Sequence, residues 1–140
     1  VRHLSTEAGS PLTGPGAAFK EGFAPQPGEA LIEKTVNSAF IGTDLEALLR
    51  QQNIGHLTIC GLTTPHCVST TTRMAGNLGW PVSLVNDACA AFARNADVSF
   101  DNGPVFAPEE SHRAALAQLH GEFATVVSTD AALSRITRQS

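Results

Sequence analysis

The sequence predicts an α/β fold in which parallel strands alternate with helices on both faces of a sheet. Short apolar runs recur along the chain, segments with helical spacing of apolar residues separate them, and Gly, Pro or Asn marks most boundaries. Apolar strands that alternate with amphipathic helices pair in parallel. Ligands of such sheets bind beyond the carboxyl ends of the strands.

The expected strands are short. Val1 to Leu4 has the pattern of the last residues of a strand, and residues 56–60 (HLTIC) have that of a buried strand in which Cys60 is an inert core thiol. The other expected strands are Ala30–Lys34, Val82–Val85 and Phe123–Val127.

Each expected helix has a recognisable start. Thr43 and Glu46 form a capping-box pattern at the start of a helix whose apolar face is Leu45, Leu48 and Leu49. A second helix is expected to start with Thr64 as N-cap and Pro65 as its first residue, and to close around Gly79. The remaining helices are expected at Pro108–His120, with Ala115, Leu116 and Leu119 facing inward, and from about Ser128–Thr129 onward.

Two segments lack a regular period. Residues 5–29 are rich in Gly, Pro, Ser and Ala and are expected to form one long loop that carries Phe19 and Phe23. A loop of this length inside a compact domain is usually functional or disordered. Residues 88–107 are mixed in character.

At 140 residues the chain fits a single domain, residues 1–140.

Composition excludes several classes of function. A net charge of −4 without a basic block argues against nucleic acid, and no apolar run approaches membrane-spanning length. The five histidines show no metal-ligand spacing, and no glycine-rich phosphate motif suggests a nucleotide cofactor. Three cysteines without a C-x-x-C pair favour a reduced, cytoplasmic protein. We therefore expect no nucleic-acid or membrane partner, no cofactor and no metal.

Cys67 is the candidate nucleophile because it follows a strand and falls in the first turn of the expected helix. Backbone N–H groups without helical partners and the positive end of the helix dipole both favour thiolate over thiol. The same N–H groups could hold the oxyanion that forms when a thiolate attacks a carbonyl. The alternative interpretation is a buried structural cysteine.

Other polar residues lie near expected strand ends. Lys34 is either a solvated lysine or an ammonium that stabilises a nearby thiolate. Asp87 is interpreted as a structural turn residue and Cys89 as a structural thiol. His66 adjoins Cys67, but adjacent side chains in a helical turn rarely meet. His3 is either a substrate contact or a surface residue.

At these residues the chain resembles a known family. EKTVNSAFIGTDLEALLR at Glu33 to Arg50, ICGLTTPHCVSTTTRMAGNLGWPVSLVNDACAAF at Ile59 to Phe92 and HRAALAQLHGEFATVVST at His112 to Thr129 follow one another in the order of the isochorismatase-like cysteine hydrolase superfamily. That superfamily includes nicotinamidases, carbamoyl-amide hydrolases and isochorismatases. The ordered series is more specific than any single motif.

The resemblance implies a three-layer α/β/α, Rossmann-like fold with a central parallel sheet and an Asp–Lys–Cys triad. Cys67 matches the nucleophile and Lys34 the triad lysine. A cis peptide bond is implied at Leu62–Thr63, and the N–H groups of Thr63 and Cys67 would then form the oxyanion hole. The resemblance also implies a homo-oligomer, a dimer or tetramer.

The chain departs from the family pattern at the triad aspartate. The family carries it at the end of the first strand, and no aspartate of this chain matches that position. We therefore expect the domain to be N-terminally incomplete in this sequence, lacking that strand and the first helix; a naturally truncated domain, inactive or completed by another chain, is the alternative. Nicotinamidases carry Asp-x-His metal ligands where this chain has Arg2-His3-Leu4-Ser5, which argues against a metal and against nicotinamide.

The expected activity is cysteine-dependent hydrolysis of a C–N bond in a small amide, ureido or carbamoyl compound through a thioester. His3, Phe19, Phe23 and Phe40 are the expected substrate pocket, although Phe40 could equally be a core residue. One alternative is an isochorismatase-type vinyl-ether hydrolase, which needs the aspartate but not the thiol. Another is an inactive scaffold or oligomerisation domain.

Overall fold

The computed structural model describes the backbone of residues 1–137 and the side chains of residues 1–135. Two compact units divide the chain, Val1–Asn53 and Ile54–Ser140. Every pair of neighbouring strands runs parallel, and helices connect the strands of the larger sheet. The predicted parallel α/β fold is thus confirmed, with its strands divided between a two-stranded sheet and a three-stranded sheet, one in each unit.

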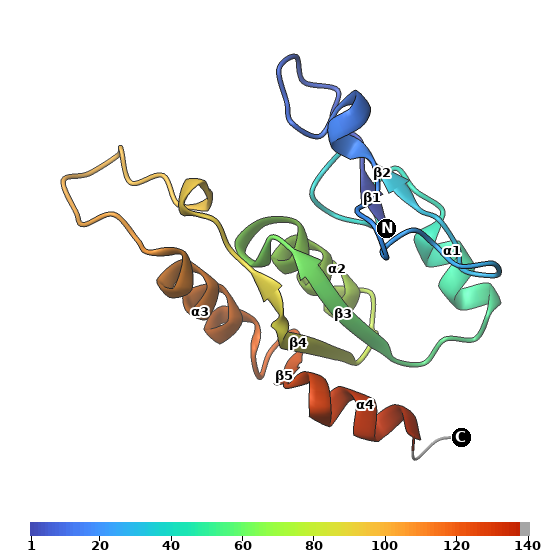
Figure 1. Ribbon diagram of the computed structural model, residues 1–140. Coiled ribbons are helices and arrows are strands. Elements are labelled where there is room, and N and C mark those ends of the chain that lie inside the picture. Colours follow the sequence, from blue (N-terminus) through green and yellow to red (C-terminus); the bar gives the residue numbers. More distant parts are fainter. Residues whose placement is uncertain (138–140) are drawn as a thin grey trace. The chain divides into compact units, whose positions relative to one another are not determined.

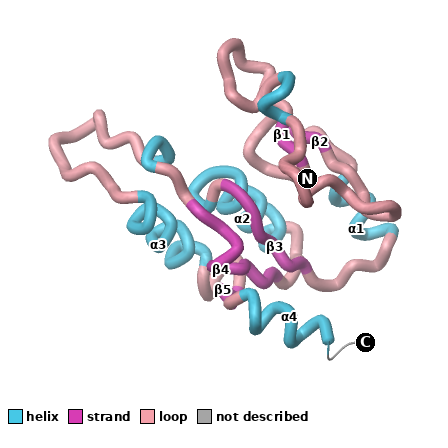
Figure 2. The backbone as a smooth tube through the Cα atoms, in the orientation of Figure 1, coloured by secondary structure: helices cyan, strands magenta, loops and turns pink. Residues whose placement is uncertain are grey.

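The first unit is mostly loop, as Figure 2 shows. Its two strands pair Arg2 with Glu33 and His3 with Lys34. The strand expected at Ala30–Lys34 is shortened to its last two residues, and the expected long loop contains one 3₁₀ turn. The elements are β1 (Arg2–His3), η1 (Gly14–Ala17), β2 (Glu33–Lys34) and α1 (Leu45–Gln51).

The capping box predicted for α1 does not form. Glu46 binds Arg50 one turn later, with 2.8 Å between a carboxylate oxygen and a guanidinium nitrogen. The Thr43 hydroxyl donates to the Ala39 carbonyl at 2.6 Å and accepts the Leu45 N–H at 3.3 Å. The prediction was wrong because the N-cap is Asp44, one residue later, so Glu46 is at the second helical position and pairs with Arg50 instead.

The second unit has the strand order β3-β4-β5, with a helix in each connection (Figure 1). Helices α2 and α3 contact each other and β4, and α4 also contacts β4. The elements are β3 (Leu57–Leu62), η2 (Thr64–Val68), α2 (Ser69–Asn77), β4 (Val82–Ala90), η3 (Ala93–Asn95), α3 (Pro108–Leu119), β5 (Thr125–Val127) and α4 (Thr129–Thr137).

The core of the second unit lies between β4 and its helices. Leu84 of β4 and Leu119 of α3 are completely buried, and Ala115 faces inward as predicted. Trp80 packs in this core and donates its indole N–H to the Ile54 carbonyl at 2.8 Å. The other buried apolar residues of this unit are Val68, Ala75, Val82, Val85, Ala124 and Ala132.

Strand β3 is not buried, contrary to the prediction. Its residues alternate between half-buried and exposed, and Cys60 is exposed. The reason is its position, because among the described strands β3 pairs only with β4 and stands at the edge of the sheet. An edge strand has one paired side, so its apolar composition alone does not indicate burial.

Strands β4 and β5 differ from their expected bounds. The buried run Val82–Val85 continues to Ala90 as one strand. Strand β5 begins at Thr125, and Phe123 lies before it with its ring 4.7 Å from the Arg73 guanidinium. Helix α2 closes as predicted, since Gly79 has φ +93° and the Trp80 N–H donates to the Ala75 carbonyl at 3.0 Å.

Among the described helices, none has the length and apolarity needed to cross a membrane.

Candidate active site

Cys67 lies in a π-helical turn that leads from the carboxyl end of β3 into α2. The Leu62–Thr63 peptide bond is cis, and the turn spans Thr64–Val68. The Thr63 carbonyl accepts the N–H groups of His66 and Val68, both at 3.2 Å. Because α2 begins at Ser69, Cys67 stands in the first turn of a continuous helical segment, residues 64–77, and its side chain is half-buried.

Thr64 has a different role from the predicted N-cap. Thr63 is the cap residue, with an extended backbone, and no side chain caps the turn. Thr64 is fully buried, and its hydroxyl lies 2.7 Å from Nδ1 of His112 on α3. The hydroxyl thus links the turn to α3 and is directed away from the backbone groups that an N-cap would bind.

His66 engages Asn95 with both ring nitrogens. Nε2 lies 3.2 Å from the Asn95 carbonyl oxygen, and Nδ1 lies 3.4 Å from the side-chain amide nitrogen. These contacts support the expectation that His66 and Cys67 do not form a dyad. The turn therefore has side-chain contacts with α3 through Thr64 and with η3 through His66.

Lys34 and His3 meet in the first unit, where they are register partners on β2 and β1. Lys34 is only 6% exposed, and its Nζ lies 3.0 Å from Nδ1 of His3 and 2.8 Å from the Val36 carbonyl oxygen. Burial lowers the pKa of His3 below its usual 6.5, and the Lys34 charge adds to this effect. The geometry therefore places a neutral imidazole against a buried ammonium.

The predicted pocket phenylalanines lie in three different settings. Phe19 stacks under the Arg2 guanidinium at 4.9 Å, and Arg2 also pairs with Glu33. Phe23 is 77% exposed. Phe40 is half-buried, and its backbone N–H bonds the Ser38 hydroxyl at 3.2 Å. All three belong to the first unit, whereas Cys67 belongs to the second.

Asp87 and Cys89 have structural roles, as expected. Asp87 accepts the backbone N–H and the hydroxyl of Thr129, both at 2.8 Å, at the start of α4. These bonds hold the pKa of Asp87 below its usual 3.8. Burial raises the pKa of the Cys89 thiol to about 11, which keeps it a thiol at neutral pH.

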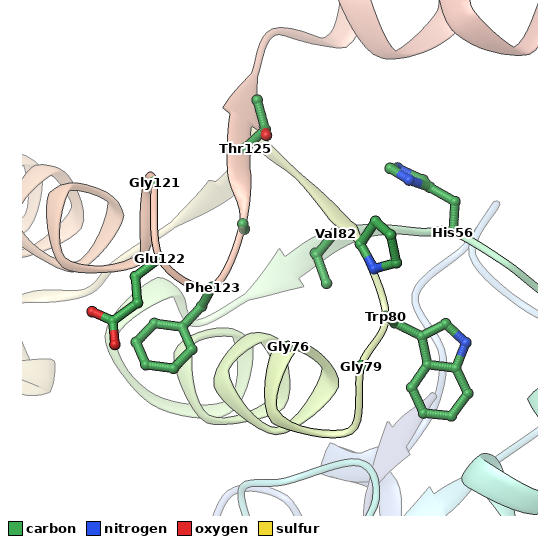
Figure 3. Close-up of a pocket in the computed structure, with 11 residues that line it drawn as sticks. His56, Gly76, Gly79, Trp80, Val82, Gly121, Glu122, Phe123 and Thr125 are labelled. Carbon is green, nitrogen blue, oxygen red and sulfur yellow. The ribbon is translucent and has the colours of Figure 1, made fainter.

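A separate cavity of about 320 Å³ lies at the amino-terminal ends of strands β4 and β5. Figure 3 shows Glu122 and Phe123 on one side of it and His56 and Trp80 on the other. The starts of β4 and β5 line it, whereas Cys67 follows the carboxyl end of β3. Six residues of β3 span roughly 20 Å, so this cavity is not part of the Cys67 site.

The sequence analysis missed His112. It continues the face of α3 that carries Ala115 and Leu119, at i+3 and i+7, and this spacing was the available signal. Its partner Thr64 is 48 residues away, and no local pattern joins the two.

Within the described residues, no group of three or more His, Cys, Asp or Glu side chains is placed to hold a metal ion.

Comparison with known proteins identifies the family. The family model of the isochorismatase domain matches residues 6–131. The isochorismatase family protein YrdC of Bacillus subtilis is 50% identical over 117 residues, which are 82% of this chain and 59% of YrdC. The crystal structure of an isochorismatase-family protein from Chromobacterium violaceum superposes with a TM-score of 0.86 at 39% identity, over 98% of this chain and 70% of that one.

Further relatives carry more specific names. A cysteine hydrolase from Pseudomonas syringae has a TM-score of 0.81 at 27% identity, over 90% of this chain and 57% of that one. Ureidoacrylate amidohydrolase RutB of Variovorax paradoxus is 38% identical over 64 residues, 46% of this chain and 25% of RutB. The chain spans about three-fifths of the first curated relatives it matches, 59% to 63% of their length. It belongs to the isochorismatase-like hydrolase family.

Proposed function

We propose that the protein hydrolyses a C–N bond in a small amide, ureido or carbamoyl compound, with Cys67 as the nucleophile. The observation that carries this proposal is the position of Cys67. It is a half-buried thiol in the first turn of a helical segment, directly beyond the carboxyl end of a parallel strand. Ligands of parallel sheets bind at this edge, and helix N-termini favour thiolate.

The proposed reaction has two halves. An aspartate of the triad takes the thiol proton, and the Cys67 thiolate attacks the carbonyl carbon. The N–H groups of Thr63 and Cys67 stabilise the oxyanion, and the Lys34 ammonium offsets the negative charge of the ion pair. The C–N bond breaks, the leaving nitrogen takes the proton from the aspartate, and a thioester remains. Water then attacks the thioester carbonyl and loses a proton to the aspartate, the C–S bond breaks, the acyl group leaves as an acid, and the Cys67 sulfur takes the proton back.

Two of the relatives support the amide chemistry. The cysteine hydrolase from Pseudomonas syringae matches most of the chain, which supports a thiol-dependent reaction. RutB is named as an amidohydrolase of a ureido compound, which supports a C–N bond as the target. His3, Phe19, Phe23 and Phe40 are retained as the proposed substrate pocket.

We also propose a cellular location and an oligomeric state for the protein. Its three cysteines include no C-x-x-C pair, which fits a reducing compartment such as the cytoplasm. We propose a homo-oligomer, dimer or tetramer, because large apolar side chains of residues 92–106 are exposed, including Phe100 at 81%. Light scattering of the full-length protein measures this directly, and a monomer at micromolar concentration would contradict it.

The test compares two cysteine variants of the full-length protein. Ammonia or amine release is measured from a panel of small amides, ureido acids and carbamoyl compounds. Cys67→Ala should abolish turnover and leave the melting temperature near that of the unaltered protein. Cys60→Ala, which removes an exposed thiol in the same strand–turn segment, should keep both.

Three results would overturn the proposal. Turnover that survives in Cys67→Ala would remove the nucleophile. Hydrolysis of a vinyl ether that resists iodoacetamide would favour the isochorismatase-type reaction. No turnover of amides or vinyl ethers by a well-folded protein would favour an inactive scaffold.

A further inference from the structure

We propose that His3 is a positioning residue whose neutral imidazole accepts a hydrogen bond from Lys34 and so fixes the ammonium for the reaction. This inference rests on the proposed function, because it assumes that Lys34 serves the Cys67 chemistry. It gives His3 a second role beside the proposed substrate contact. It also adds a protonation requirement that the Asp–Lys–Cys triad alone does not have.

The geometry of Lys34 carries the inference. A long, flexible lysine side chain is rarely buried unless polar partners hold its ammonium. Here the side chain is 6% exposed, and Nζ reaches Nδ1 of His3 at 3.0 Å and the Val36 carbonyl oxygen at 2.8 Å. Direct register pairing of His3 with Lys34 places both side chains on the same face of the two-stranded sheet. These contacts with His3 and Val36 contribute to the position of the ammonium.

The bond fixes the protonation state and tautomer of His3. An ammonium only donates, so Nδ1 must be the unprotonated ring nitrogen and the ring proton must be on Nε2. The charged groups that act on His3 are Lys34, which disfavours the imidazolium, and Glu7, which favours it. Burial is the largest influence, and the net effect lowers the pKa of His3. Arg2 and Glu33 pair one residue earlier and therefore face the other side of the sheet.

Protonation of His3 would convert this contact from attraction to repulsion. Imidazolium donates from both nitrogens and carries a positive charge, so it cannot accept from the ammonium. The lowered pKa puts this change below pH 6.5, the usual value for histidine. Lys34 would then lose the hydrogen bond to His3 as the solution becomes acidic, and the reactivity of Cys67 would fall with it.

Asparagine and leucine at position 3 form a matched pair for the test. The two side chains have the same branched shape, but only asparagine has an oxygen near the position of Nδ1. His3→Asn should keep the hydrogen bond at every pH, whereas His3→Leu should remove it. Lys34→Met is the companion variant, because it removes the ammonium and keeps the length of the chain.

The readout is the rate at which iodoacetamide alkylates Cys67, measured from pH 5 to pH 9 in the full-length protein. A Cys60→Ser background leaves Cys67 as the one cysteine of tryptic peptide 51–73, so mass spectrometry follows it alone. His3→Leu should slow alkylation about tenfold at neutral pH, because a displaced ammonium stabilises the thiolate less. His3→Asn should restore most of the rate and lack the fall that begins below pH 6.5 in the unaltered protein.

The outcomes separate this inference from the proposed function. If Lys34→Met leaves the rate unchanged, the role of Lys34 in the proposed function fails, and the inference fails with it. If Lys34→Met slows alkylation but His3→Asn behaves like His3→Leu, the proposed function stands and the positioning role of His3 is overturned. The contact has a direct check as well, because NMR titration should show the pKa of His3 rising in Lys34→Met.

Discussion

Lys34 and Cys67 are held in place by different means. In the first unit, whose residues are all described, the buried apolar side chains are only Ala17 and Ala39, and polar contacts to His3 and Val36 position Lys34. In the second unit, the Cys67 turn is continuous with α2, which packs on a core that includes Leu84 and Leu119.

The difference predicts how each region responds to change. A turn that rests on a packed core loses stability when core volume is removed. An ammonium held by hydrogen bonds loses its position when one acceptor is removed or protonated, and a buried donor left unpaired costs about 1–3 kcal/mol as well. Mutations in the second unit should therefore act mainly on unfolding, whereas mutations around Lys34 should act on chemistry as well as on stability.

The largest expected effect on stability is that of Leu119→Ala. Leu119 is 0% exposed, and truncation of a buried leucine to alanine lowers the free energy of unfolding by about 2–5 kcal/mol. The matched change in the first unit is Leu31→Ala, where the side chain is 44% exposed and the loss should be much smaller. Urea titration measures both. Equal losses would remove the contrast between the two regions.

A smaller effect is expected from Thr64→Val, which removes the buried hydroxyl without changing the shape of the side chain. His112 then loses the partner that lies 2.7 Å from its Nδ1, and such a loss costs about 1–3 kcal/mol. Thr58→Val is the control, because Thr58 is exposed on β3. If the two variants melt at the same temperature, the Thr64–His112 bond does not support the Cys67 turn.

The smallest effect is expected at Asp87, which is exposed and binds the first residue of α4. Asp87→Ala should lower the melting temperature by a few degrees at pH 7. Because the folded state depresses the pKa of Asp87 below 3.8, its stabilisation is present above pH 3.8 and is lost as the pH falls through the folded value. The difference between Asp87→Ala and the unaltered protein should therefore shrink in acid. A difference that stays constant with pH would contradict the charge-assisted cap.

Much of the fold could be predicted from local pattern. Helix α3 and the end of α2 follow from Pro108, from apolar spacing and from Gly79, because each of these signals acts within one turn of helix. The burial of β3 could not be predicted, since an apolar strand looks the same in the middle of a sheet and at its edge. The capping-box prediction failed because the helix is capped at Asp44, one residue after Thr43.

The candidate site was predicted in part. The position of Cys67 after a strand follows from the break at Gly61 and Pro65, whereas the role of Thr64 depends on His112, which lies 48 residues further along the chain. The contact of His3 with Lys34 likewise joins strands 31 residues apart. Sequence spacing places both residues at strand ends, but only the register of the strands brings them into hydrogen-bonding distance.

The most direct test of the account is the mass of the protein during turnover. The amide of the panel that releases most ammonia is mixed with the full-length protein, and the reaction is stopped in acid. We expect an added acyl mass on tryptic peptide 51–73, lost on treatment with hydroxylamine and absent in Cys67→Ala but present in Cys60→Ala. Two results would contradict the assignment of Cys67 as the nucleophile. One is that Cys67→Ala still turns over the amide although it forms no acyl adduct. The other is an acyl adduct on peptide 74–94, which carries Cys89.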